Sequence, residues 1–172
     1  YSQFAKADID FAYNSYITDK VRLVFHSGLG LGVPYGNATI LPFEERYYSG
    51  GANSMRGWSA RRLGPGNFNN SSGSIDFMKQ SGDIKLDLNL EARFRLVWKL
   101  EAALFLDAGN IWTIRDYTEQ PTGLFRWNEF YKQIACNYGL GLRLDFDFFV
   151  VRVDMGIKLY DPGYPIKSER WR

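Results

Sequence analysis

Apolar and polar residues alternate without error along residues 83–96. Every even position from Ile84 to Leu96 is apolar, and every odd position is an aspartate, lysine, asparagine, glutamate or arginine. A period of two belongs to the β-strand, in which successive side chains point to opposite faces of the sheet. The pattern therefore predicts a long strand with one apolar face and one charged face.

Five further segments alternate in the same way, and the pattern predicts no helix of useful length. They cover residues 4–17, 21–33, 99–112, 134–146 and 148–160. Each exceeds the roughly 9–11 residues that a tilted strand needs to cross a bilayer. Three connections are short, and two are long, at about 34–81 and 113–133. Short turns at one end and long loops at the other are typical of outer-membrane barrels.

The fold class expected from these features is all-β, an antiparallel meander that forms part of a transmembrane β-barrel. Aromatic residues near the strand ends support a membrane setting, and we expect them at the lipid interfaces: Trp98, Trp112, Tyr138 and Tyr160. A soluble barrel or sandwich, with its apolar face packed inward, would produce the same alternation. The length of the segments and the unequal loops favour the membrane alternative.

The composition limits which ligands, disulfides and partners the chain is expected to have. The 172 residues carry a net charge of +2, too little to indicate a nucleic-acid partner. One cysteine, Cys136, excludes a disulfide within the chain. The single histidine, His26, has no cysteine or acidic pair at a metal-binding spacing. We therefore expect no metal, no cofactor, no catalytic site and no bound nucleic acid.

The first long loop carries a short motif that resembles a known signature. Its residues Met55-Arg56-Gly57-Trp58 are similar to the aliphatic-Arg-Gly-aromatic signature of the BamA/TamA family of bacterial surface-antigen barrels. Met55 stands where valine or isoleucine is commoner. The family also has Phe-x-Asp-x-Gly on the strand after next, matched by Phe105-Leu-Asp107-Ala-Gly109, and an inward acidic residue on the strand between, matched by Glu91.

The resemblance implies more of the architecture than the chain contains. Family members have a sixteen-stranded barrel preceded by periplasmic POTRA domains, in the outer membrane of Gram-negative bacteria. Residues 1–172 would then supply six strands of the C-terminal part, without the POTRA domains and the final strand, and the loop at 34–81 would lie inside the lumen. The extension at 61–66 resembles the TamA-like branch.

The resemblance also implies a function without catalysis, the assembly, insertion or translocation of outer-membrane proteins. The implied partners are outer-membrane lipids, nascent outer-membrane proteins and periplasmic or inner-membrane assembly partners. Two alternatives stay open. One is a two-partner secretion pore or passive channel, and the other is a soluble β-barrel binding module.

The motif residues suggest how the loop is anchored. Asp107 and Glu91 share the charged, inward parity of their strands, and Arg56 offers a planar fork of donors suited to carboxylates. We expect Arg56 to contact one or both of them. Gly57 would let the loop approach the wall, with Trp58 as an apolar plug. Gly109 would leave room for the loop on the strand.

Overall fold

The computed structural model describes residues 2–69, 78–146 and 148–171, which form one antiparallel sheet of six strands in chain order. The strands are β1 (Gln3–Thr18), β2 (Val21–Tyr35), β3 (Ile84–Val97), β4 (Leu100–Trp112), β5 (Ala135–Phe146) and β6 (Phe149–Tyr160). Each begins and ends within two residues of a segment predicted by alternation. The predicted all-β meander is confirmed.

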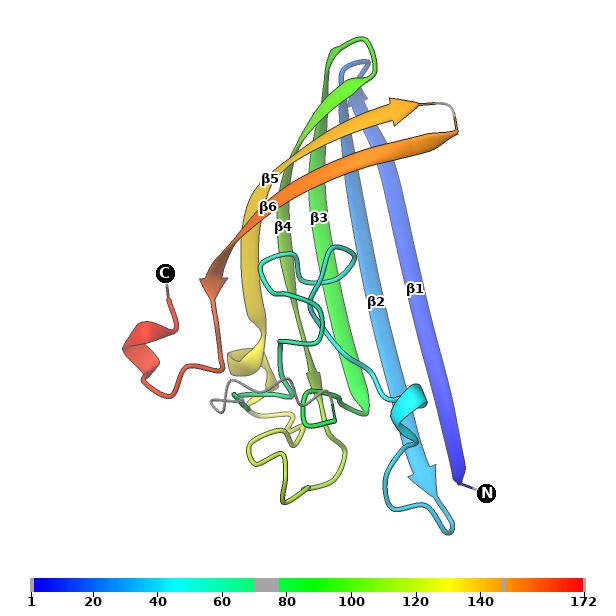
Figure 1. Ribbon diagram of the computed structural model, residues 1–172, viewed down its shortest axis with the longest axis vertical. Coiled ribbons are helices and arrows are strands. Elements are labelled where there is room, and N and C mark those ends of the chain that lie inside the picture. Colours follow the sequence, from blue (N-terminus) through cyan, green and yellow to red (C-terminus); the bar gives the residue numbers. More distant parts are fainter. Residues whose placement is uncertain (1, 70–77, 147, 172) are drawn as a thin grey trace.

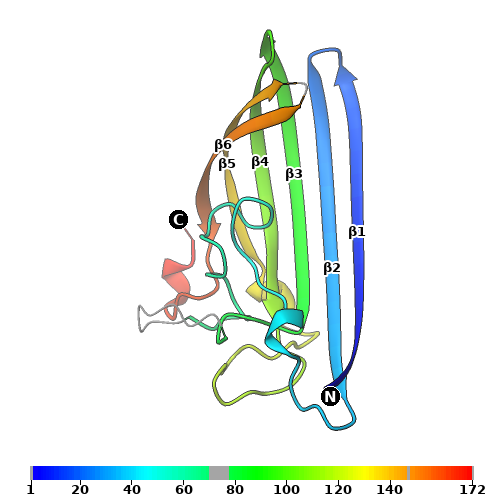
Figure 2. The ribbon, with the colours of Figure 1, turned by 45° about the vertical axis from the view of Figure 1, so that its right-hand side comes forward.

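The sheet curls like part of a barrel wall. β1 to β4 run side by side along the long axis, while β5 and β6 curve across them (Figure 1). The loop between β2 and β3 lies on the concave side of this wall in both ribbon views (Figure 2). Of the expected 34–81 loop, residues 70–77 lie outside the described residues.

Within residues 2–69, 78–146 and 148–171, helical structure is limited to single turns of 3-10 helix. These are η1 (Phe43–Glu45), η2 (Phe130–Gln133) and η3 (Lys167–Glu169). Among the described residues, no helix is both long enough and apolar enough to cross a membrane.

The apolar face of the sheet is exposed and the polar face is buried, which is the reverse of the arrangement in a soluble protein. On the convex face, Leu140 is 54% exposed and Val153 is 65% exposed. On the concave face, the Asp107 and Asn137 residues are wholly buried beneath the loop. Large apolar side chains that stay exposed in rows mark a surface that meets something other than water. This arrangement contradicts the soluble alternative, in which the apolar face would form the core.

Trp112 departs from its expected place at the lipid interface. Its residue is 1% exposed, because the loop after β4 folds back over it. The rings of Phe125 and Phe130 pack edge-to-face against the indole, with centroids 5.6 and 6.4 Å away. Its Nε1 donates a hydrogen bond to Oε1 of Gln133 at 2.7 Å. By contrast, Trp98 at the opposite end is 76% exposed.

Candidate functional site

The tip of the β2–β3 loop is a compact turn that presents Arg56 to the barrel wall. Gly50 and Gly51 have φ of +102° and +93°, values that favour glycine. Backbone hydrogen bonds close the turn, from Gly51 N to Trp58 O at 2.8 Å and from Trp58 N to Met55 O at 3.1 Å. The backbone conformation thus fixes the direction of the motif side chains.

The structure brings Arg56, Asp107 and Glu91 into direct contact. Nε and Nη2 of Arg56 donate to Oδ2 and Oδ1 of Asp107 at 2.9 and 2.7 Å, a bidentate pair. Nη1 donates to Oε2 of Glu91 at 2.6 Å. The backbone N–H of Arg56 adds a bond to Oδ2 of Asp107 at 3.2 Å. One arginine therefore joins the loop tip to both β3 and β4.

Burial makes this contact strong and selective. The Arg56 side chain is 6% exposed, and its guanidinium lies 3.5 Å from the centre of the Phe105 ring. A planar guanidinium can stack flat on an aromatic face and still point its in-plane N–H groups at carboxylates, which an ammonium cannot do. Burial alone would lower the pKa of Arg56, but hydrogen bonds to Asp107 and Glu91 outweigh it and raise that pKa above its ordinary value. The anchor is therefore a permanent cation.

Two asparagines hold Asp107 from either side. Nδ2 of Asn89 on β3 donates to Oδ1 at 2.9 Å, and Nδ2 of Asn137 on β5 donates to Oδ2 at 2.9 Å. Asn89 also donates to the Ser54 carbonyl of the loop at 2.8 Å. The sequence pattern places both asparagines on the inward face of their strands. It does not single them out as partners of Asp107, because polar residues fill that whole face.

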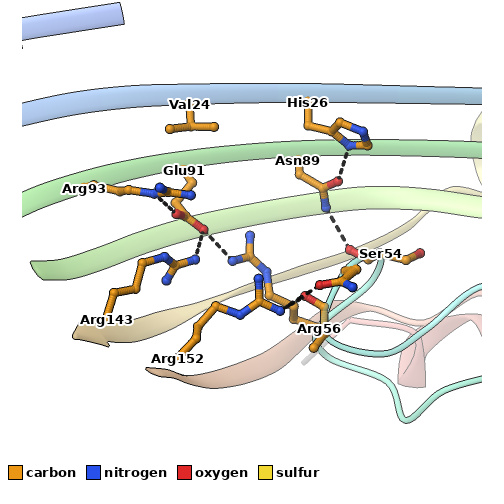
Figure 3. A pocket seen from close by; sticks show the side chains of 11 residues that line it. Val24, His26, Ser54, Arg56, Asn89, Glu91, Arg93, Arg143 and Arg152 are labelled. Atoms are coloured by element: carbon orange, nitrogen blue, oxygen red, sulfur yellow. Dashed lines mark hydrogen bonds and ion pairs between the residues drawn. The ribbon is translucent and has the colours of Figure 1, made fainter. Parts of the chain in front are cut away.

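Glu91 is shared by three arginines. Besides Arg56, it accepts from Nη2 of Arg143 on β5 at 2.6 Å and from Nε of Arg93 on its own strand. Arg143 also reaches Asp154 on β6, with 3.3 Å between Nη1 and Oδ1. Figure 3 shows Arg56, Arg93 and Arg143 converging on the Glu91 carboxylate. These contacts of Glu91 and Arg143, together with the Arg56–Asp107 pair, therefore link β3, β4, β5 and β6.

Glycines let the loop approach the wall closely, but only one of the two expected glycines does so. A Cβ on Gly57 would lie 2.7 Å from the Cβ of Asn137, so its close approach to the wall is real. A Cβ on Gly109 would meet the Leu86 carbonyl of the neighbouring strand at 2.2 Å, and no loop atom is among its nearest neighbours. The loop instead crosses Gly156 of β6, where a Cβ would lie 2.7 Å from the Arg56 carbonyl.

Met55 and Trp58 fill the space beneath the tip. Both are buried in an apolar cluster with Leu63 and Ala135. Trp58 is more than a plug, because its Nε1 donates to Oδ2 of Asp161, just after β6, at 3.2 Å. The loop is therefore tied to the last described strand as well as to β3 and β4.

A polar cavity of about 210 Å³ remains beside the anchor, lined by the loop tip and the inward faces of β2, β3, β5 and β6. Nη2 of Arg152 crosses it to the Ala52 carbonyl at 2.7 Å and to Oδ1 of Asn53 at 2.9 Å. In the described part of the chain, no three His, Cys, Asp or Glu side chains gather as metal ligands would. The site is built from ion pairs within the protein.

Comparisons with known proteins agree with this geometry. The model of the Omp85 superfamily domain matches residues 1–172. The outer membrane protein assembly factor BamA of Neisseria meningitidis is 28% identical over 105 residues, which cover 58% of this chain and 13% of that protein.

Two solved structures share the fold. BamA from Haemophilus ducreyi lacking POTRA domains 1-3 superposes with a TM-score of 0.71 at 17% identity, covering 91% of this chain and 32% of that one. CdiB from Acinetobacter baumannii gives a TM-score of 0.55 at 18% identity, covering 94% and 24%. The chain thus spans at most 32% of the length of these relatives. It belongs to the Omp85 superfamily, as a BamA-like part of an outer-membrane β-barrel of Gram-negative bacteria.

Proposed function

We propose that this barrel assembles or translocates outer-membrane proteins without catalysis, and that the loop anchored by Arg56 holds the wall in its working shape. The observation that carries the proposal is the buried bidentate pair between Arg56 and Asp107, with Nη1 of Arg56 on Glu91. A buried charge network is costly unless its geometry is complete, so it fixes one arrangement of loop and strands.

The clients would be nascent outer-membrane proteins that add strands to an exposed edge of the barrel. Main-chain hydrogen bonds give such pairing an affinity that tolerates many sequences. Sequence similarity to a named outer-membrane assembly factor supports this choice. In the whole protein, the six strands would join further strands and upstream POTRA domains. Periplasmic or inner-membrane assembly partners would bring the clients.

The proposal is tested with the full-length protein in proteoliposomes, by the rate at which an unfolded outer-membrane protein inserts. Arg56→Ala should slow insertion strongly. Arg56→Lys should also slow it, because an ammonium cannot form the fork. Arg62→Ala, an exposed arginine of the same loop, is the matched control and should insert clients normally. Equal rates in all four proteins would contradict the anchor.

A two-partner secretion pore is the second candidate, since the fold also matches CdiB. The same liposomes separate the two functions. An assembly barrel inserts several unrelated clients into the bilayer, whereas a secretion pore moves one partner through to the other side. Release of a single soluble partner without insertion of any barrel client would favour the secretion pore.

A further inference from the structure

A groove with an apolar lining lies on the convex face of the sheet, near the end that carries the long loops. Its volume is about 400 Å³. The floor comes from outward side chains of the first three strands, and the wall comes from Trp112 and the loop that follows it. The lining includes the side chains of Ala7, Ile9, Leu29, Leu31, Phe125, Trp127 and Phe130.

The wall is an ordered aromatic cluster. The Phe125 ring contacts the rings of Trp112, Trp127 and Phe130, with centroids 5.6, 5.1 and 5.5 Å away. Such packing adds stability beyond the area that it buries. The cluster leaves Trp127 81% exposed at the edge of the groove. The loop thus raises an aromatic ridge beside the strands.

The lining selects for a hydrocarbon ligand. The floor side chains Ile9, Leu29 and Leu31 are aliphatic and exposed. The indole Nε1 of Trp112 is already bonded to Gln133. A ligand in the groove therefore gains stability from burying apolar surface and gains little from hydrogen bonding.

The position of the groove indicates which hydrocarbon ligand it can meet. The convex face of an outer-membrane barrel meets lipid, and the long loops of such barrels lie at the extracellular side. The groove therefore opens toward the outer leaflet. Arg126 and Lys132 are exposed on the wall segment, with one acidic residue, Glu129, between them. Residues 125–132 therefore carry an excess of one positive charge, which would attract an anionic headgroup.

We propose that the groove binds one acyl chain of an outer-leaflet lipid whose phosphate group pairs with Arg126 or Lys132. The bound lipid would brace the loop after β4 against the strands. The proposal needs only the outer-membrane location and does not depend on the assembly function. Lipid binding and client insertion are separate measurements, so that failure of one is distinguishable from failure of the other.

Native mass spectrometry of the full-length protein in detergent tests the site, with phosphatidic acid and phosphatidylcholine titrated separately. The wild-type protein should retain one phosphatidic acid at a several-fold lower concentration than phosphatidylcholine. Ala7→Phe fills the floor and should bind both lipids about tenfold more weakly, the loss expected when roughly two methylene groups lose contact. Ile9→Trp should weaken the binding of both lipids to the same extent, and it provides a second groove-filling variant if Ala7→Phe folds poorly.

The matched control is Ala102→Phe, on the same face of β4 near the other end of the barrel, and it should bind like wild type. Arg126→Gln combined with Lys132→Gln should abolish the preference for phosphatidic acid and leave phosphatidylcholine binding unchanged. Unchanged binding in both groove-filling variants, or equal loss in Ala102→Phe, would overturn the groove. Equal binding of the two lipids by wild type would overturn the headgroup contact.

Discussion

Truncating Arg56 to alanine should leave the Asp107 carboxylate stranded inside the wall. The Asp107 side chain is fully buried, and Arg56 supplies three of its five hydrogen bonds, the others coming from two asparagines. Removing one partner of a buried ion pair costs about 3–5 kcal/mol. Glu91 keeps its ion pairs with Arg93 and Arg143, so the carboxylate left with too few partners is mainly that of Asp107. We therefore expect the lower end of that range.

A double-mutant cycle isolates this cost. Asp107→Asn removes the negative charge and keeps the shape, and the double variant with Arg56→Ala no longer buries an unpaired charge. The double variant should be more stable than the sum of the single effects predicts, by about 1–3 kcal/mol. The free energy of unfolding is measured by urea titration of the full-length protein in lipid vesicles, followed by tryptophan fluorescence.

Arg62→Ala serves as the baseline, because an exposed substitution should change stability by no more than about 0.5 kcal/mol. Additivity of the Arg56 and Asp107 effects within about 0.5 kcal/mol would refute the reasoning, since residues that share a buried bond cannot act independently.

Three further results are expected. Gly156→Ala places a Cβ 2.7 Å from the loop backbone and should destabilise the protein by about 1–3 kcal/mol, read from its urea midpoint. Trp58→Phe keeps an aromatic ring of smaller size but loses the Nε1 bond to Asp161, and trypsin should then cut the loop faster than in wild type. Burial and the Asp83 carboxylate raise the pKa of Tyr117 from 10.0 to about 12, so its contribution to stability is complete below pH 10 and is lost as pH rises through 12. Melting temperatures of Tyr117→Phe should lack that part of the decline.

The strands could be predicted because alternation is a local property. Residues 83–96 assign every side chain of β3 to a face, and that parity puts Glu91 on the concave side, where the structure has it. The partnership of Arg56 with Asp107 joins residues 51 positions apart, and only the paired motifs indicated it.

The rest of the network could not be predicted from the same pattern. Asn137 and Arg143 look like any other polar residue on a wet wall, because parity gives the face but not the height at which a loop meets it. Gly156 shows no sign in the sequence that a loop crosses it. Trp112 has the parity of a lipid-facing residue, and only the folded loop reveals that aromatic rings cover it.

The most direct test of the account replaces the ionic anchor with a covalent one. In an Arg56→Ala, Asp107→Asn, Cys136→Ser background, which leaves no Asp107 carboxylate unpaired, Gly57→Cys and Asn137→Cys put a cysteine on the loop and another on β5. An added Cβ at Gly57 lies 2.7 Å from that of Asn137, so the loop must move out by about 1 Å to reach disulfide distance. The measurement is the client insertion rate before and after reduction. If anchoring is what the loop contributes, the oxidised protein inserts clients near the wild-type rate and the reduced one does not. A formed disulfide without recovery of insertion would contradict the account.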